Sequence, residues 1–446
     1  MRAVADVQAI VVDAMRALPS DLIEARVASR RSLADLAEWR RAGRGARPSS
    51  SQVSVASSRL LRAALLAGER SAVVGDASLR HAAARLFEAC AALALVEETS
   101  ADQPGRGPTL RDEPAVRTWL ARTGDLRGVR MQGFRCLVAL TGVDLTGARL
   151  CGLDASDAGW AGADLTGATL DDVDLSGADL SGASFTARSV LSTSMARADL
   201  ARTTWERARI ETLDLTEATL DDVDFSCATS ARDIVLTAAS ARRARFFAAD
   251  LTGADLRRTS LEGASFRQCM LMGANLDGAP LSSCDLSGSS LRGASLLAVT
   301  ATRLVLVGAD LRAANLQRMR VTELDASHAD AADAVFTGSD LSGASFAGAT
   351  LDRADLSSVI ARHACFDRAG LAGANLRSSS LLGASFRYAD LSGACLDGSV
   401  LADATLTDAN LHRTSREGAD LVGANLRGAR PTDPLRARAQ DFRSPT

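Results

Sequence analysis

The chain has 446 residues, with 51 basic and 54 acidic residues and a formal net charge of −3 at pH 7. All of the basic residues are arginines, so no lysine is available to form a Schiff base, anchor pyridoxal phosphate or complete a Walker A motif. Aromatic residues make up only 4% of the chain, which favours a core of many similar small layers.

Residues 1–97 are expected to form an α-helical domain. The apolar spacing indicates four helices, near residues 3–18, 21–42, 52–67 and 77–97. Asp21, followed by Glu24, is typical of a capping box. Residues 98–123 are predicted to be a linker and a short helix near Ala115–Arg122. We expect this helix to cap the repeats that follow, because the open end of a stacked coil is an unpaired edge.

The N-terminal segment and the cysteines indicate a cytoplasmic protein. No run approaches the roughly 20 apolar residues of a membrane span. Asp6 and Asp13 interrupt the N-terminal apolar segment, which argues against a signal peptide. The eight cysteines contain no CxxC pair, and the four histidines have no zinc-ligand spacing. We therefore expect no disulfides, no metal, no cofactor and no contact with a membrane.

From about residue 138 the sequence repeats in units of five. Residues 163–167, ADLTG, are one example, and the triplet Ala-(Asp/Asn)-Leu occurs 14 times. We call the Leu or Phe of each five the centre. The centre and the residue two positions before it are apolar, and the other three are mostly polar. A period of five fits neither a long helix nor an ordinary strand, so it predicts a solenoid with one corner per five.

The large aromatic centres set the size of one coil. They recur at every fourth five, so four fives make a square coil, and 58 fives make about 14 coils. The step from Phe225 to Phe246 is one residue longer than four fives, which predicts a one-residue bulge near Ala241–Arg245. The expected core ladder comprises Phe185, Trp205, Phe225, Phe246, Phe266, Phe346, Phe366 and Phe386.

These fives resemble the pentapeptide repeat protein family. The resemblance implies a mainly β fold, a right-handed quadrilateral β-helix with stacked Leu and Phe centres. We place this β-helix at residues 124–429, after the small helical domain, and a polar C-terminal tail at 430–446. Arg416 stands at a centre, which indicates that the last coil is open enough for its charged group to reach water.

The first coils form an acidic collar. Residues 133–225 hold 16 acids and 7 arginines, a net charge of −9, against +5 for residues 1–132 and +1 for residues 226–446. The collar attracts a basic partner surface, or binds the basic N-terminal domain, or merely reflects the frequency of Asp before a centre. The candidate partner-binding residues are Asp154, Asp164, Asp171, Asp172, Asp174, Asp179, Asp214, Asp221, Asp222 and Asp224.

Two arginine clusters are the other charged candidates. Arg242, Arg243 and Arg245 lie at the expected bulge, where they bind an anion or an acidic partner, or only solvate an irregular corner. Arg40 and Arg41 belong to a basic stretch without interleaved aromatic residues, so direct binding of nucleic acid is not favoured.

The sequence favours binding over catalysis. A rod presents flat faces in place of a deep pocket, and no nucleophile, zinc or phosphate-binding motif appears. The leading hypothesis is a non-catalytic scaffold or adaptor that presents these faces to a protein partner, while the helical domain docks or forms an oligomer. The alternative comes from the resemblance, since some pentapeptide repeat proteins are DNA mimics that bind DNA gyrase, a topoisomerase, and protect it from inhibitors.

Overall fold

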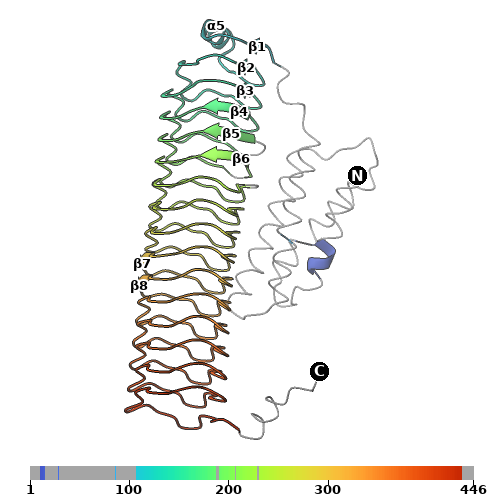
Figure 1. The fold of residues 1–446 in the computed structure, drawn as a ribbon. Helices are drawn as coiled ribbons and strands as arrows, with labels where there is room; N and C mark the ends of the chain where they lie inside the picture. Colours follow the sequence, from blue (N-terminus) through green and yellow to red (C-terminus); the bar gives the residue numbers. More distant parts are fainter. Residues whose placement is uncertain are drawn as a thin grey trace, which may run out of the picture.

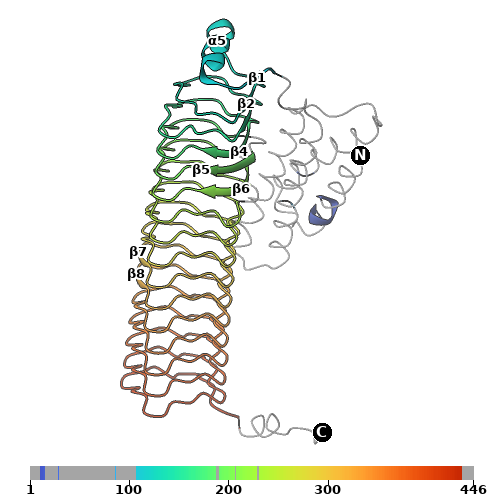
Figure 2. The same ribbon diagram turned by 45° about the horizontal axis from the view of Figure 1, so that its top comes forward.

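The computed structural model contains a long rod of stacked coils, seen from two directions in Figure 1 and Figure 2. It describes residues 11–15, 29, 86, 107–186, 190–205, 207–228 and 231–433. Residues 11–15 are helical. The rest of the expected helical domain and most of the expected tail lie outside the described residues. The rod is a β-helix, as the period of five predicts.

Parallel pairing between successive coils holds the rod together. Its first strands form a six-stranded sheet in chain order, and two later strands pair with each other. Elsewhere in the described rod, single parallel bridges replace longer strands. The elements are β1 (Thr109–Leu110), α5 (Glu113–Thr123), β2 (Arg130–Gln132), β3 (Arg149–Cys151), β4 (Thr169–Asp174), β5 (Val190–Ser194), β6 (Arg209–Asp214), β7 (Thr300–Thr302) and β8 (Arg320–Thr322).

Each unit of five has one side-chain pattern. In residues 163–167, Ala163 and Leu165 are fully buried, and Asp164 between them bridges to the neighbouring coils. The chain then turns, and Gly167 has a φ of 67°, in the left-handed region that glycine tolerates best. Each side of the coil is a short straight segment followed by a corner, and together they take five residues. The straight segment contributes one small and one large residue to the core.

The coil-to-coil step is four fives along most of the rod. One ladder of bridges runs through Asp255, Asn275, Ser295 and Asn315 and continues to Ser415. Pairing begins at β1, which lies before the residue 124 at which the β-helix was expected to start. The β-helix therefore begins earlier in the chain than expected, and its number of coils differs slightly from the expected 14.

The predicted position of the bulge is wrong. Bridges join Asp214 to Val235 and Asp224 to Arg245 across a step that is one residue longer than four fives, whereas Val235 to Asp255 is again the regular step. Leu236 and Ala241 are buried, while Val235 and Ser240 take the bridging position. The extra residue therefore lies between Phe225 and Ala231. This register is favoured because Leu236 fills the core better than Val235 would. Arg242, Arg243 and Arg245 stand on a regular corner.

The aromatic centres form two stacks inside the rod. The five rings from Phe185 to Phe266 stack with centroid separations between 4.2 and 5.4 Å. Phe346, Phe366 and Phe386 form a second stack with separations of 5.3 and 4.9 Å. Phe336 meets Phe346 edge to face. All of these rings are buried, and offset stacking adds to the free energy of burial.

Helix α5 closes the N-terminal end of the rod. The Asp112 side chain accepts a hydrogen bond from the Ala115 amide, and Gly124 ends the helix in the left-handed conformation. Val116 is buried, and Trp119 and Leu120 pack against the core cluster. The helix expected near Ala115–Arg122 is thus present and covers the first coil.

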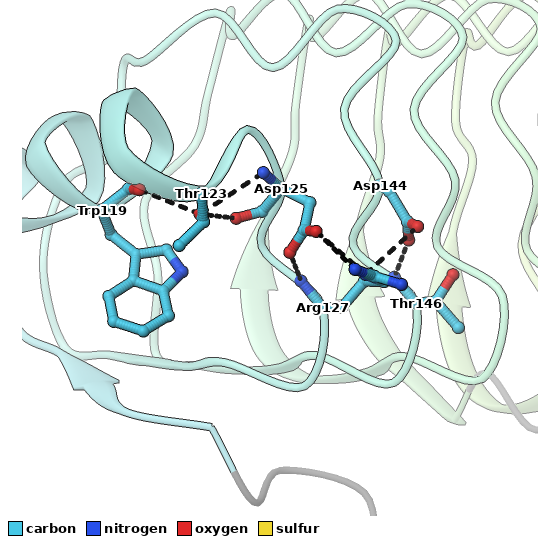
Figure 3. Close-up of polar contacts among 6 residues, drawn as sticks. All are labelled: Trp119, Thr123, Asp125, Arg127, Asp144 and Thr146. Atoms are coloured by element: carbon cyan, nitrogen blue, oxygen red, sulfur yellow. Dashed lines mark hydrogen bonds and ion pairs between the residues drawn. The ribbon is translucent and has the colours of Figure 1, made fainter.

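Polar contacts continue from this cap into the first coils (Figure 3). The Thr123 hydroxyl lies 2.9 Å from the Trp119 carbonyl oxygen and 2.8 Å from that of Asp125. Arg127 donates to the Asp125 carboxylate, at 2.7 Å for the shorter contact, and lies 3.7 Å from Asp144 in the next coil. These contacts tie the end of α5 to the register of the coils.

The other end of the described rod is open. Leu411 is buried, but the Arg416 side chain is exposed in the last coil, as its place at a centre predicts. Leu421 and Ala424 are only partly buried, and Leu426 is 38% exposed.

We predict that substitutions at Phe366 reveal how much ring stacking contributes to the free energy of unfolding. Phe366→Ala should lower the free energy of unfolding by about 3–5 kcal/mol, since it leaves a cavity between two rings. Phe366→Leu should cost roughly 1–2 kcal/mol, because leucine already fills the same ladder at Leu286 and Leu306. Denaturant unfolding measures both, and equal losses would contradict this account of the core.

Candidate functional site in the acidic collar

The collar contains two acidic clusters on different sides of the rod. Asp171, Asp172 and Asp174 belong to β4, which pairs with β3 and β5. Asp221, Asp222 and Asp224 lie two and a half coils later, on the opposite side. The structure does not bring the two clusters together, so each is a separate surface.

The second cluster is neutralised by the three candidate arginines of the next coil. Arg243 donates two hydrogen bonds of 2.7 Å to the Asp222 carboxylate. Arg245 lies 2.9 Å from Asp224, and Arg242 lies 3.7 Å from Asp221. Each pair spans the longer coil-to-coil step that the extra residue creates. One set of coil-to-coil ion pairs therefore joins the basic candidate site to three residues of the acidic candidate site, Asp221, Asp222 and Asp224.

The strongest of these pairs changes the acidity of its carboxyl group. The hydrogen bond from Arg243 holds the pKa of Asp222 below its ordinary value of 3.8. The paired guanidinium has a raised pKa for the same reason. Both side chains are largely exposed, so solvent screens the pair and limits its contribution to stability.

Six of the ten candidate collar aspartates, including one from each cluster, serve the turns of the rod. Each of these carboxylates accepts a hydrogen bond from the backbone amide two residues later, which stabilises the corner after the centre. The acceptors are Asp154, Asp164, Asp174, Asp179, Asp214 and Asp224, at distances from 2.9 to 3.1 Å. This local role explains why Asp is common before a centre and supports the simpler interpretation for these residues.

The β4 acidic surface, which we define as Asp171, Asp172 and Asp174, differs from the second cluster. Its residues form no ion pair with any described residue, and Asp171 faces Ser192 of β5 in the sheet register. Strands β4, β5 and β6 are also longer than the other strands of the described rod. Asp172 keeps the left-handed φ of the corners, at 53°, and the pairing of β4 with β5 shifts register between Asp171 and Val173. Three carboxylates are therefore presented together without an ion pair to a described residue.

A hollow of about 450 Å³ opens beside the β4 acidic surface. Three successive coils line it, with residues 152–154, 172–174 and 192–194. Leu153 and Val173 are buried apolar residues, whereas Asp172 and Asp174 are exposed. The hollow thus combines apolar walls with carboxylates and hydroxyls.

Thr193 in this hollow is a residue that the sequence reasoning missed. Its side chain is 7% exposed, and its hydroxyl has no hydrogen-bond partner. The other polar residues at the same inward position each donate to a leucine carbonyl oxygen at 2.6 to 2.8 Å: Thr203, Thr259, Ser289, Ser339, Ser379, Ser399 and Thr414. The signal in the sequence was a threonine where alanine is usual.

Two cysteines of the described rod lie in its core. Cys269 and Cys284 are buried, each donates its Sγ to a backbone carbonyl, and burial raises the pKa of Cys284 to about 12. Among the described residues, no group of three His, Cys, Asp or Glu side chains is arranged to hold a metal ion. No described helix is long and apolar enough to cross a membrane.

We predict that Arg243→Gln raises the pKa of Asp222 towards 3.8. The ion pair favours the charged carboxylate, so its stabilisation is present above the unfolded-state pKa and is lost as the pH falls through the lower folded-state pKa. Carboxyl carbon NMR titration measures this shift. Asp333, whose pKa is held down by Arg353, is the internal control and should not move.

We also predict opposite effects of the same substitution at two buried threonines. Thr193→Val should raise the free energy of unfolding by about 1 kcal/mol, because it removes an unpaired hydroxyl. Thr203→Val should lower it by about 1–3 kcal/mol, because this hydroxyl donates to the Leu200 carbonyl and accepts from Trp205 Nε1 at 2.8 Å. Denaturation midpoints compare the two, and a loss of stability at residue 193 would contradict the assignment.

Several solved structures are similar in sequence to parts of this chain. HetL from the cyanobacterium Nostoc, a pentapeptide repeat protein involved in regulating heterocyst differentiation, is 28% identical over 60% of this chain and 88% of its own, with a TM-score of 0.15. Full-length QnrB1, a plasmid-mediated fluoroquinolone resistance protein, is 23% identical over 46% of this chain and 88% of its own, with a TM-score of 0.21. A pentapeptide repeat protein from the Arabidopsis thaliana thylakoid lumen is 32% identical over 22% and 72%, with a TM-score of 0.13.

Comparison by sequence agrees with the repeat. No curated protein matches the chain. The family model described as pentapeptide repeats matches eight copies, within residues 154–186, 249–288, 281–318, 322–358, 364–403 and 397–428. With its units of five, buried centres and square coils, this chain belongs to the pentapeptide repeat protein family.

Proposed function

We propose that this protein is a non-catalytic interaction scaffold that binds a basic surface of a protein partner through the β4 acidic surface. The observation that carries this proposal is the contrast between two acidic clusters of equal charge. Arginines of the next coil occupy the cluster at Asp221, Asp222 and Asp224. The β4 acidic surface has no such cation among the described residues.

Electrostatics supports a basic partner for this surface. Unpaired carboxylates on an exposed ribbon keep their charge available and attract positive surfaces as they approach. The extended strands β4, β5 and β6 provide a rigid platform, which limits the entropy lost on binding. The rod sets the spacing between this platform and other parts of the chain.

The N-terminal domain supplies the second attachment in this proposal. Residues 1–97, which we expect to be helical, dock a second partner or form an oligomer. A scaffold needs two such attachment points, and the β4 acidic surface supplies one of them. This division of roles rests on the sequence pattern of residues 1–97.

DNA mimicry with binding to gyrase is the alternative function. It requires an acidic surface that continues along a rod of duplex-like width. Beyond the collar, several aspartates are paired with arginines within or between coils, as in Arg312–Asp310 at 2.5 Å and Arg353–Asp333 at 2.7 Å. This alternation of charge favours the scaffold over the mimic.

We predict that a triple substitution in the β4 acidic surface abolishes partner capture. Full-length protein carrying Asp171→Asn, Asp172→Asn and Asp174→Asn should lose the partner from a lysate of the source organism, as judged by mass spectrometry. Capture by the unaltered protein should also fall at 0.5 M salt, where screening acts over about 4–5 Å.

The matched control neutralises the other cluster. Asp221→Asn, Asp222→Asn and Asp224→Asn remove the same charge but leave β4 intact, so capture should persist. Equal loss with both triples, or retention with the first, would sink the proposed site. Recovery of gyrase subunits would establish the alternative function, whereas a different partner would support the scaffold.

A further inference from the structure

We propose that the side of the rod centred on Ile360 and Val400 is an interface with a second, antiparallel copy of this chain. This side is separate from the β4 acidic surface, so the inference goes beyond the proposed function. Two observations carry it: an apolar strip that is exposed to solvent, and charges of opposite sign beside the two halves of that strip.

The C-terminal apolar strip, which we define as Ile360, Leu382, Val400, Ala402 and Val422, runs along one side of the last coils. Parallel bridges link residues 360, 380, 400 and 420 in turn, which places Ile360 and Val400 in the middle of this side. The amides of residues 363, 383 and 403 donate to the carbonyl oxygens of Leu382, Ala402 and Val422, so these three follow one another along the adjoining corner. Ile360, Val400 and Val422 are 41%, 39% and 75% exposed.

This strip differs from the rest of the rod surface. Three of the eight large apolar side chains that are exposed in the described part of the chain belong to it. In the same coils, the middle residues of the other three sides are small or polar. Single exposed apolar residues need no explanation, whereas a contiguous row of them marks a surface that another molecule covers.

The charges beside the strip divide this side into a basic and an acidic half. In the coils of residues 360 and 380, this side and its two flanking corners carry Arg362 and Arg377 and no acidic residue. In the coils of residues 400 and 420, the same positions carry acids and no arginine. These acids are Asp397, Asp403, Glu417 and Asp420.

Most of these charges are not neutralised within the chain. Arg362 forms no ion pair with a described residue, and its Nε lies 3.4 Å from the Ser380 hydroxyl. Asp403, Glu417 and Asp420 likewise form no ion pair in the described part of the chain. The exception is Arg377, which lies 3.6 Å from Asp397. The basic half therefore keeps one unpaired cation, and the acidic half keeps three unpaired carboxylates.

A two-fold rotation brings each basic half against an acidic half. The axis lies in the plane of this side, across the rod, between the coils of residues 380 and 400. Arg362 then faces Asp420 of the second copy, and Leu382 faces Ala402 of the second copy. An interface between identical copies needs a surface that complements itself, and this side does so only in the antiparallel orientation. An axis along the rod would place Arg362 against Arg362.

The test measures the mass of the full-length protein by sedimentation velocity over a roughly hundredfold range of concentration. We expect a dimer that dissociates on dilution. Val400→Asp should raise the dissociation constant about tenfold or more, because it places a charge in the middle of the apolar strip. Tyr388→Asp is the matched control, since Tyr388 is an exposed residue of the same coils on a corner that does not flank this side, and it should leave the constant unchanged.

An exchange of charges tests the orientation. Arg362→Glu and Asp420→Arg should each weaken the dimer about tenfold, because like charges then meet across the interface. An equimolar mixture of the two variants should dimerise as the unaltered protein does, since opposite charges then meet at both contacts. A variant that has lost its fold cannot restore association in a mixture, so this arm separates loss of the interface from loss of the fold.

Four results would overturn the inference: a monomer throughout the concentration range, an equal loss with Tyr388→Asp, a mixture of the charge variants that stays monomeric, or a dimer that Val400→Asp leaves intact. The last result would place association elsewhere in the chain. Partner capture by the β4 acidic surface is measured independently, so failure of either proposal leaves the other standing.

Discussion

The coil-to-coil backbone ladder determines which side chains meet in this protein. Each bridging residue pairs with the residue one coil later, so a side chain's neighbour is fixed by a count along the chain. Parallel pairing of this kind satisfies the backbone polar groups while the Leu and Phe centres fill the interior. Core stacking, charge pairing and surface shape all depend on that count.

The extra residue before Ala231 illustrates how sensitive the surface is to this count. With the step lengthened by one residue, Asp221, Asp222 and Asp224 meet Arg242, Arg243 and Arg245 one for one. The regular step of four fives would shift each arginine by one position. An acidic and a basic cluster that look like two binding sites in the sequence are, in the fold, a set of mutually satisfied charges.

The sequence predicts those features of the fold that recur from coil to coil. The square coil and the stack through Trp205 and Phe246 follow from periodic large side chains, and the covering helix follows from the need to close an edge. The position of the extra residue was missed because Val235 and Leu236 both satisfy an apolar pattern, and only packing separates them. The unpaired state of Thr193 depends on β5 being straight, which no local pattern in residues 190–194 specifies.

Function in a repeat protein is most readily found where the repeat is broken. Identical coils give identical surfaces, so a partner can recognise one place along the rod only through a departure from the pattern. The segment of β4, β5 and β6 is such a departure: its strands are longer, their pairing shifts register, its three aspartates form no ion pair with a described residue, and the Thr193 hydroxyl has no partner. Burying that hydroxyl without a partner costs stability, whereas the Thr203 hydroxyl at the same inward position is paired. The same local irregularity in the ladder that weakens the rod therefore also distinguishes this surface from the regular coils on either side.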